Sequence, residues 1–117
     1  MKDNILATGS LDRTIKIWNI KLAKLDVTLK GHTNGVWCLE FITNLLLCSG
    51  SYDSTIKIWN LRNGFCLKTL TEHSGPVWQF VRKDTLLISV SHDKSVNFKL
   101  INFILLITNK IFYVKIG

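Results

Sequence analysis

The middle of the chain alternates apolar and polar residues in short runs that are separated by turn-forming residues. These runs, in chain order, are residues 36–41, 45–49, 55–59 and 65–70. Period-two alternation is typical of half-buried β-strands, and the continuous apolar residues 45–48 within the second run are typical of a strand covered on both faces. Asn63-Gly64 is a hairpin signal, because both residue types tolerate the positive φ of a tight hairpin. The pattern therefore predicts four short antiparallel strands.

The same pattern recurs along the chain with a period of 41 residues. SLDRTIKIWN (10–19) and SYDSTIKIWN (51–60) match at eight of ten positions, and SHDKSVNFKL (91–100) is a weaker third copy. A period of about 40 residues indicates stacked supersecondary units, each of which buries its apolar face against its neighbours.

The period divides the chain into four segments. We expect a partial first repeat at 1–30 that lacks its first strand, a complete second repeat at 31–71, a partial third repeat at 72–98, and a divergent apolar and basic tail at 99–117. The tail begins where a 40-residue spacing from Trp59 predicts Trp and the chain has Lys99. The tail is either a degenerate third and fourth strand or a segment foreign to the fold, and the composition slightly favours the second alternative.

The Gly31-His32 opening, the SGSYDSTIKIW segment and the 41-residue period resemble the WD-repeat β-propeller family over residues 4–98. The resemblance implies an all-β fold, a partial β-propeller of four-stranded antiparallel blades. A closed propeller needs at least four blades of about 40 residues. We therefore expect an incomplete, open array, a fragment of a larger propeller, whose free sheet edges allow self-association.

In that family a His, a Ser or Thr, an Asp and a Trp form a buried hydrogen-bond chain within each blade. The resemblance places this structural tetrad at His32, Ser49, Asp53 and Trp59 in the second repeat, at Thr8, Asp12 and Trp18 in the first, and at His73, Ser89 and Asp93 in the third. Buried polar groups need partners, so such a chain would tie the loops of a blade together. Ser, His and Asp also resemble a hydrolase triad, but the set repeats and no G-x-S-x-G elbow accompanies it. We predict no catalytic residue and no enzyme.

Two further tryptophans and three residues before the turn aspartates are candidate partner contacts. The resemblance places them on the face that carries the turns: Trp37, Tyr52, Trp78, His92 and Leu11. Trp and Tyr are favoured interface anchors. The alternative is that Trp37 and Trp78 only pack adjacent blades together.

The leading functional prediction is a non-catalytic protein–protein interaction scaffold. An alternative is the substrate-receptor propeller of a ubiquitin ligase, because the SGSYDSTIKIWN…CLKTL phrasing resembles F-box WD-repeat proteins. Some of those proteins hold phosphate with arginines where this chain has aromatics. A third hypothesis is weak nucleic-acid or anionic-lipid binding through the net charge of +7. The lysines stand singly, so nucleic acid is the less favoured partner.

The remaining chemistry predicts neither a cofactor nor a metal. Cys38, Cys48 and Cys66 lack C-x-x-C spacing and are expected to be small buried hydrophobic residues in a reducing compartment. His32 and His73 are 41 residues apart without nearby paired Cys. No leader sequence is recognisable, and the apolar run at 100–107 is too short to span a bilayer. We expect a cytoplasmic or nuclear protein.

Overall fold

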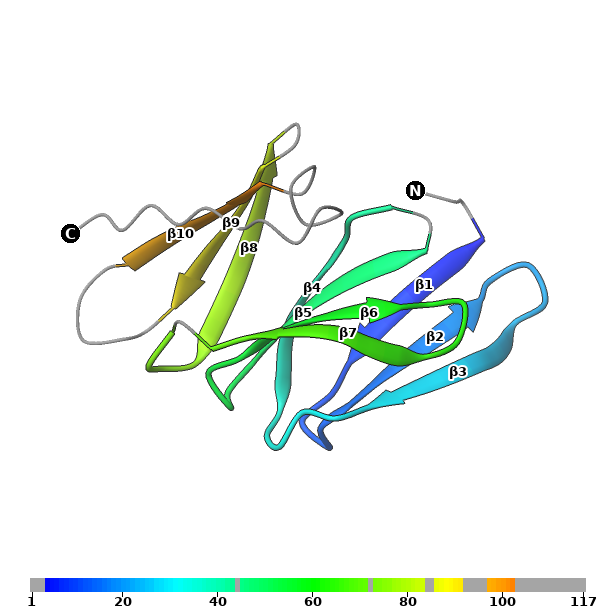
Figure 1. The fold of residues 1–117 in the computed structure, drawn as a ribbon. Coiled ribbons are helices and arrows are strands. Elements are labelled where there is room, and N and C mark those ends of the chain that lie inside the picture. Colours follow the sequence, from blue (N-terminus) through cyan, green and yellow to red (C-terminus); the bar gives the residue numbers. More distant parts are fainter. Residues whose placement is uncertain (1–3, 44, 72, 84–85, 92–96, 103–117) are drawn as a thin grey trace.

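The structure, a computed structural model, describes residues 4–43, 45–71, 73–83, 86–91 and 97–102. All regular structure in these ranges is β-strand, arranged as three antiparallel sheets that follow one another along the chain (Figure 1). The predicted all-β class, an open array of propeller-type sheets, is confirmed. Each sheet is built from strands that are consecutive in the sequence, so the pairing is local.

The first sheet has the order β1-β2-β3, the second β4-β5-β6-β7 and the third β8-β9-β10. The strands are β1 (Ile5–Gly9), β2 (Thr14–Asn19), β3 (Lys24–Lys30), β4 (Val36–Phe41), β5 (Leu46–Ser51), β6 (Ile56–Asn60), β7 (Phe65–Leu70), β8 (Val77–Lys83), β9 (Leu86–Ser91) and β10 (Asn97–Asn102). The second sheet contains the four predicted strands. β4 and β7 have the predicted bounds, and the two strands between them are shifted by one or two residues.

The second sheet is covered on both faces. Leu47 and Trp59 pack with apolar residues of the first sheet, whereas Cys48 and Ile58 pack with Val77 and its neighbours in the third. Successive residues of a strand point to opposite faces, so the adjacent Leu47 and Cys48 serve different cores. This arrangement explains why residues 45–48 are continuously apolar.

Gly50 allows the second and third sheets to approach closely. A Cβ built at this position would lie 2.5 Å from Cys38 Sγ and 2.7 Å from Val77 Cγ1. Both distances are shorter than real Cβ contacts, so any larger residue at Gly50 would push the two sheets apart.

The backbone of the turns repeats with the same 41-residue period as the sequence. Gly64 has φ +77° in the β6–β7 hairpin, which confirms the hairpin signal, and Ala23 has φ +50° in the β2–β3 hairpin. Arg13 (φ +78°) and Ser54 (φ +72°) form a second pair that is 41 residues apart, in the turns after β1 and β5. Left-handed backbone costs a non-glycine residue roughly 1–2 kcal/mol. Arg13 and Ala23 therefore occupy positions set by the turn geometry rather than by their own preferences.

The register of the third sheet corrects one sequence assignment. Lys99 pairs with Ser89, as Lys57 pairs with Ser49, and it is Ile101 that takes the register position of Trp59. Lys99 was expected at the Trp position because a constant repeat length was assumed. The assumption fails because Lys99 follows Ser89 by ten residues, whereas Lys57 follows Ser49 by eight.

β10 also helps to decide whether the tail at 99–117 begins as a degenerate strand or as a segment foreign to the fold. β10 continues through Lys99 to Asn102 and pairs with β9, so residues 99–102 form a divergent third strand. Residues 103–117 lie outside the described residues.

Candidate functional site

A chain of buried hydrogen bonds crosses the second sheet. Trp59 Nε1 on β6 donates to Ser49 Oγ on β5 at 2.7 Å. Ser49 Oγ lies 2.6 Å from His32 Nε2, and His32 Nδ1 lies 2.8 Å from Asp53 Oδ2 in the turn after β5. The structure thus brings together all four side chains that the sequence assigned to the second repeat.

The chemistry of the groups fixes the direction of the chain. An indole N–H can only donate and a carboxylate can only accept. Asp53 therefore accepts from Nδ1–H of His32, and in the neutral ring, which burial favours, Nε2 accepts from the Ser49 hydroxyl. Burial lowers the pKa of His32 below its ordinary value of 6.5, although Asp53 opposes the shift.

Asp53 is held ionised by several donors. Burial alone would raise the pKa of Asp53, but hydrogen bonds from Thr55, His32 and Thr33 lower it to about 2. Thr55 donates both its hydroxyl (2.6 Å) and its backbone N–H (2.9 Å), and the Thr33 N–H donates at 3.0 Å. The carboxylate fastens the loop before β4 to the turn after β5.

These contacts follow the connectivity of a Ser-His-Asp triad, but the hydroxyl is enclosed. Ser49 has an exposed fraction of 0%, and its oxygen already accepts the indole N–H of Trp59. A nucleophile has to reach the reacting atom of its substrate. In this conformation Ser49 cannot do so.

The other repeats hold parts of the same arrangement. In the first sheet Trp18 Nε1 donates to Thr8 Oγ1 at 3.0 Å in an exposed position, and Asp12 accepts from the Thr14 hydroxyl and N–H. In the third repeat His73 is buried. The side chains of Ser89 and Asp93 lie outside the part of the chain for which side chains are described.

Three of the candidate partner contacts form an aromatic cluster, which we define as Trp37, Tyr52 and Trp78. Their ring centroids are 5.0 Å (Trp37–Tyr52), 5.7 Å (Trp37–Trp78) and 5.3 Å (Tyr52–Trp78) apart. Trp37 is 44% exposed and Trp78 is 39% exposed. Leu11 is 70% exposed and lies beside Gly35, and His92 is outside the described residues.

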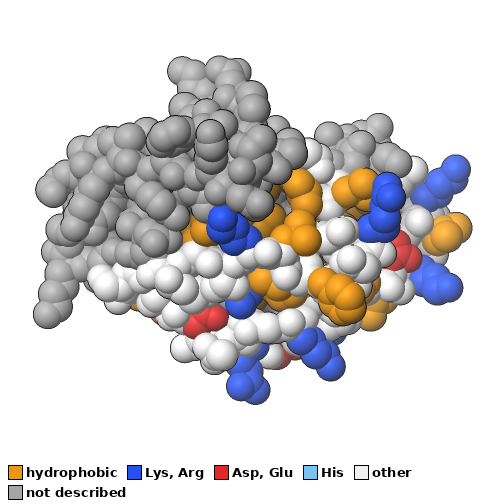
Figure 2. Space-filling model, viewed as in Figure 1, with side chains coloured by type: hydrophobic (Ala, Val, Ile, Leu, Met, Phe, Trp, Pro, Cys, Tyr) orange, Lys and Arg blue, Asp and Glu red, His pale blue; other side chains and the backbone are white. Residues whose placement is uncertain are grey.

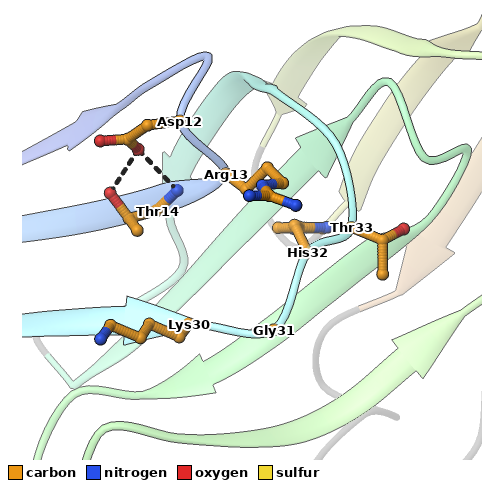
Figure 3. A pocket seen from close by; sticks show the side chains of 7 residues that line it. All are labelled: Asp12, Arg13, Thr14, Lys30, Gly31, His32 and Thr33. Carbon is orange, nitrogen blue, oxygen red and sulfur yellow. Dashed lines mark hydrogen bonds between the residues drawn. The ribbon is translucent and has the colours of Figure 1, made fainter.

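Sequence reasoning did not find a pocket that lies between the turn after β1 and the loop before β4. It has a volume of about 320 Å³ and is lined by Asp12, Arg13, Thr14, Lys30, Gly31, His32 and Thr33 (Figure 3). Arg13 lies in the turn after β1 and Lys30 ends β3, so both line one pocket only because β2 pairs with β3, and in Figure 3 their charged ends point away from each other. The one signal in the sequence is that Arg13 stands where the second repeat has Ser54.

The cysteines correct a second expectation. Cys48 is buried and Cys38 is half-buried, and burial raises the pKa of the Cys38 thiol to about 12 and that of Cys48 well above its ordinary value. Cys66 is exposed on β7, because this strand lies at the edge of the sheet and turns that face to solvent. The expectation that all three are buried is wrong for Cys66.

Other site types find little support in the described residues. The described residues include no group of three or more His, Cys, Asp or Glu that could hold a metal ion. No helix among them has the length and apolar character needed to cross a membrane. Lysine and arginine side chains are spread over the face shown in Figure 2 and do not gather in one patch.

Comparison with known proteins places these features in context. A family model described as "WD domain, G-beta repeat" matches residues 2–19, 23–60 and 64–98, which is more than half of the chain. Transducin beta-like protein 3 of Bos taurus is 47% identical over 38 residues, 32% of this chain and 5% of that protein. F-box/WD repeat-containing protein sel-10 of Caenorhabditis elegans is 51% identical over 35 residues, 30% of this chain and 6% of that protein.

A solved structure shows the same fold. The WD40 repeats of RRP9 superpose with a TM-score of 0.75 at 23% sequence identity, over 85% of this chain and 30% of that one. The matched segments therefore span less than a tenth of the length of these two curated relatives, and the chain covers under a third of this structural neighbour.

Proposed function

Because this chain belongs to the WD40 repeat family, we propose that it binds other proteins through a surface that contains the aromatic cluster. WD40 repeats imply a protein-interaction scaffold, and proteins of this family are generally non-catalytic. We propose that this protein is likewise a non-catalytic scaffold. The hydrogen-bonded side chains from Trp59 to Asp53 then stabilise the second sheet.

The observation that carries the proposal is the exposure of the two indoles. A soluble surface seldom leaves several large aromatic side chains in mutual contact and still exposed to water, and such patches mark interaction sites. Trp37 and Trp78 remain 44% and 39% exposed although they touch each other and Tyr52. Tryptophan and tyrosine are also the residue types that contribute most to binding at interfaces.

Packing between repeats accounts for only part of the cluster. Trp37 is on β4 and Trp78 is on β8, so their contact joins the second and third sheets. The exposed part of each ring contributes nothing to that packing. A partner that covers it would remove apolar surface from water, worth roughly 25 cal/mol per Å².

The test compares Trp37→Ala with a matched control. Phe65 is 71% exposed at the start of β7, in the hairpin at the other end of the second sheet. We expect partners captured from a cell lysate by the immobilised chain, quantified by mass spectrometry, to be lost with Trp37→Ala and kept with Phe65→Ala. Thermal unfolding of both variants checks that they fold. Partners retained by a folded Trp37→Ala, Tyr52→Ala double variant would refute the proposal.

No specific observation favours either alternative function, the ubiquitin-ligase substrate receptor or the binder of nucleic acid or anionic lipid. The similarity to sel-10, which is named an F-box/WD repeat protein, covers 6% of that protein. On the face drawn in Figure 2 the described basic side chains are dispersed, whereas nucleic-acid binding favours basic residues clustered on one face. A cytoplasmic or nuclear location remains a prediction, which the three free cysteines support because free thiols persist in reducing compartments.

A further inference from the structure

The chain contains two Asn-Gly pairs, Asn34-Gly35 in the loop before β4 and Asn63-Gly64 in the β6–β7 hairpin. In an Asn-Gly pair the backbone nitrogen of the glycine can attack the side-chain carboxamide of the asparagine, because glycine has no Cβ to shield the nitrogen. Both asparagines are exposed. Sequence and exposure therefore do not distinguish the two pairs, and the hydrogen bonds around each pair decide which of them reacts.

The reacting groups of Asn34 and Gly35 face each other. The Gly35 N–H donates to Asn34 Oδ1 at 2.7 Å, and among the described residues neither group has another hydrogen-bond partner. The carboxamide carbon is bonded to this oxygen at about 1.2 Å, so it lies within about 3.9 Å of the Gly35 nitrogen. Reacting atoms about 3–3.5 Å apart form a near-attack conformer. Rotation about χ2 of Asn34, which is a soft torsion, turns the face of this carbon toward the nitrogen.

The same rotation opens the Gly35 N–H to water. Gly35 is buried, but its N–H points at the exposed Asn34 side chain. When the carboxamide turns, the N–H loses its acceptor and faces solvent, where hydroxide can remove the proton. The Gly35 carbonyl is held meanwhile by the Ser51 hydroxyl at 2.8 Å and by the Tyr52 N–H at 3.0 Å. The loop therefore keeps the nitrogen in place while the side chain moves.

The reacting groups of Asn63 and Gly64 are bonded to other residues. The Gly64 N–H donates to the Asn60 carbonyl at 2.8 Å, and Asn63 Oδ1 accepts from the Phe65 N–H at 2.9 Å. Both hydrogen bonds have to break before the Gly64 nitrogen can attack the Asn63 carboxamide. The hairpin therefore protects its Asn-Gly pair, whereas the loop before β4 leaves the other pair poised to react.

We propose that Asn34 is a site of spontaneous deamidation in the folded chain, with water as the co-reactant. Hydroxide removes the Gly35 N–H proton, the nitrogen bonds to Asn34 Cγ, and the Cγ–Nδ2 bond breaks, so that ammonia leaves after taking a proton from water. One water molecule then adds to either carbonyl of the resulting five-membered succinimide. The ring opens to an aspartate or an isoaspartate at position 34. In sum an amide and water give a carboxylic acid and ammonia, and nothing is oxidised or reduced.

The isoaspartate product changes the loop more than the aspartate product does. Both add a negative charge, but isoaspartate also routes the main chain through Cβ and so inserts a methylene before Gly35. Gly35 and Val36 are fixed on the far side of that methylene, by Ser51 and Tyr52 and by the Ser10 carbonyl at 2.9 Å from the Val36 N–H. We therefore expect the isoaspartate form to unfold at a lower temperature than Asn34→Asp, which carries the same charge on a normal main chain.

The experiment measures the deamidation rates of both pairs in the same full-length chain. The chain is incubated at mildly alkaline pH, folded or unfolded in guanidinium chloride, and digested with trypsin, which places the pairs in separate peptides, 31–57 and 63–68. Mass spectrometry quantifies the conversion of amide to acid in each peptide. We expect similar rates for the two pairs in the unfolded chain. In the folded chain we expect Asn34 to convert roughly tenfold faster than Asn63, because two hydrogen bonds have to open at Asn63.

Asn34→Ser is the matched control, because peptide 31–57 also contains Asn44. The change removes an exposed carboxamide that bonds only to the next residue, so the fold should be kept and conversion of this peptide should stop. Conversion that persists in the folded Asn34→Ser chain would overturn the inference. Equal slowing of both pairs by folding, or faster conversion of Asn63 than of Asn34 in the folded chain, would overturn it as well.

Discussion

Replacing Ser49 by alanine tests the energetic role of the buried polar chain. The change removes one oxygen that serves two buried donors or acceptors, Trp59 Nε1 at 2.7 Å and His32 Nε2 at 2.6 Å. Both partners are almost fully buried, so neither can turn to water. A buried polar group without a partner costs about 1–3 kcal/mol. We expect Ser49→Ala to lower the free energy of unfolding by roughly 2–6 kcal/mol, the sum over two groups.

Thr8→Ala is the matched control, because it removes the same indole–hydroxyl bond in the first sheet. Trp18 Nε1 donates to Thr8 Oγ1 at 3.0 Å where water can replace the hydroxyl, so we expect a loss of about 1 kcal/mol or less. Urea unfolding followed by tryptophan fluorescence measures both variants, with the slope against urea checking that the unfolded state is unchanged. Equal losses for Ser49→Ala and Thr8→Ala would refute the argument.

Three further predictions follow from backbone geometry, close packing and titration. Ala23→Gly should raise the free energy of unfolding by about 0.5–1 kcal/mol, because φ +50° is strained for alanine. Gly64→Ala should lower it by a similar or larger amount, because alanine would have to adopt φ +77°. The denaturant midpoints of the two variants test both expectations. Gly50→Ala should cost about 1–3 kcal/mol by pressing on Val77, and a thermal midpoint equal to wild type would contradict this. Because the pKa of His32 is lowered in the folded state, the imidazole of the unfolded chain is protonated first as the pH falls. The free energy that the neutral His32 contributes to stability is therefore complete above pH 6.5 and is lost as the pH falls below that value. An NMR titration of the folded chain that gives a ring pKa of 6.5 or more would contradict this prediction.

Features set by local pattern could be predicted from the sequence. The strands of the second repeat and the hairpin at Gly64 follow from alternation and turn chemistry, which act over a few residues. The polar chain from Trp59 to Asp53 was predicted from a resemblance. Its side chains lie at hydrogen-bond distance because strand pairing brings Ser49 next to Trp59 and brings the loop before β4 next to the turn after β5.

Features that depend on loop length or on tertiary neighbours could not be predicted. Lys99 was misplaced because two additional residues precede its strand position, and spacing alone cannot locate an insertion. Cys66 lies within an apolar run, yet its strand is at the edge of the sheet and the side chain is exposed. The pocket combines the turn after β1 with the end of β3, where Thr14 pairs with Lys30, so no local motif marks it.

The three thiols differ in burial, so the rates at which a reagent modifies them report how often the second sheet opens. A maleimide reagent would modify Cys66 at once, whereas Cys48 and Cys38 become reactive only when the middle sheet opens, because burial suppresses their thiolates. Counting adducts over time by mass spectrometry would report how often the second sheet parts from the third, in native buffer and without any engineered label.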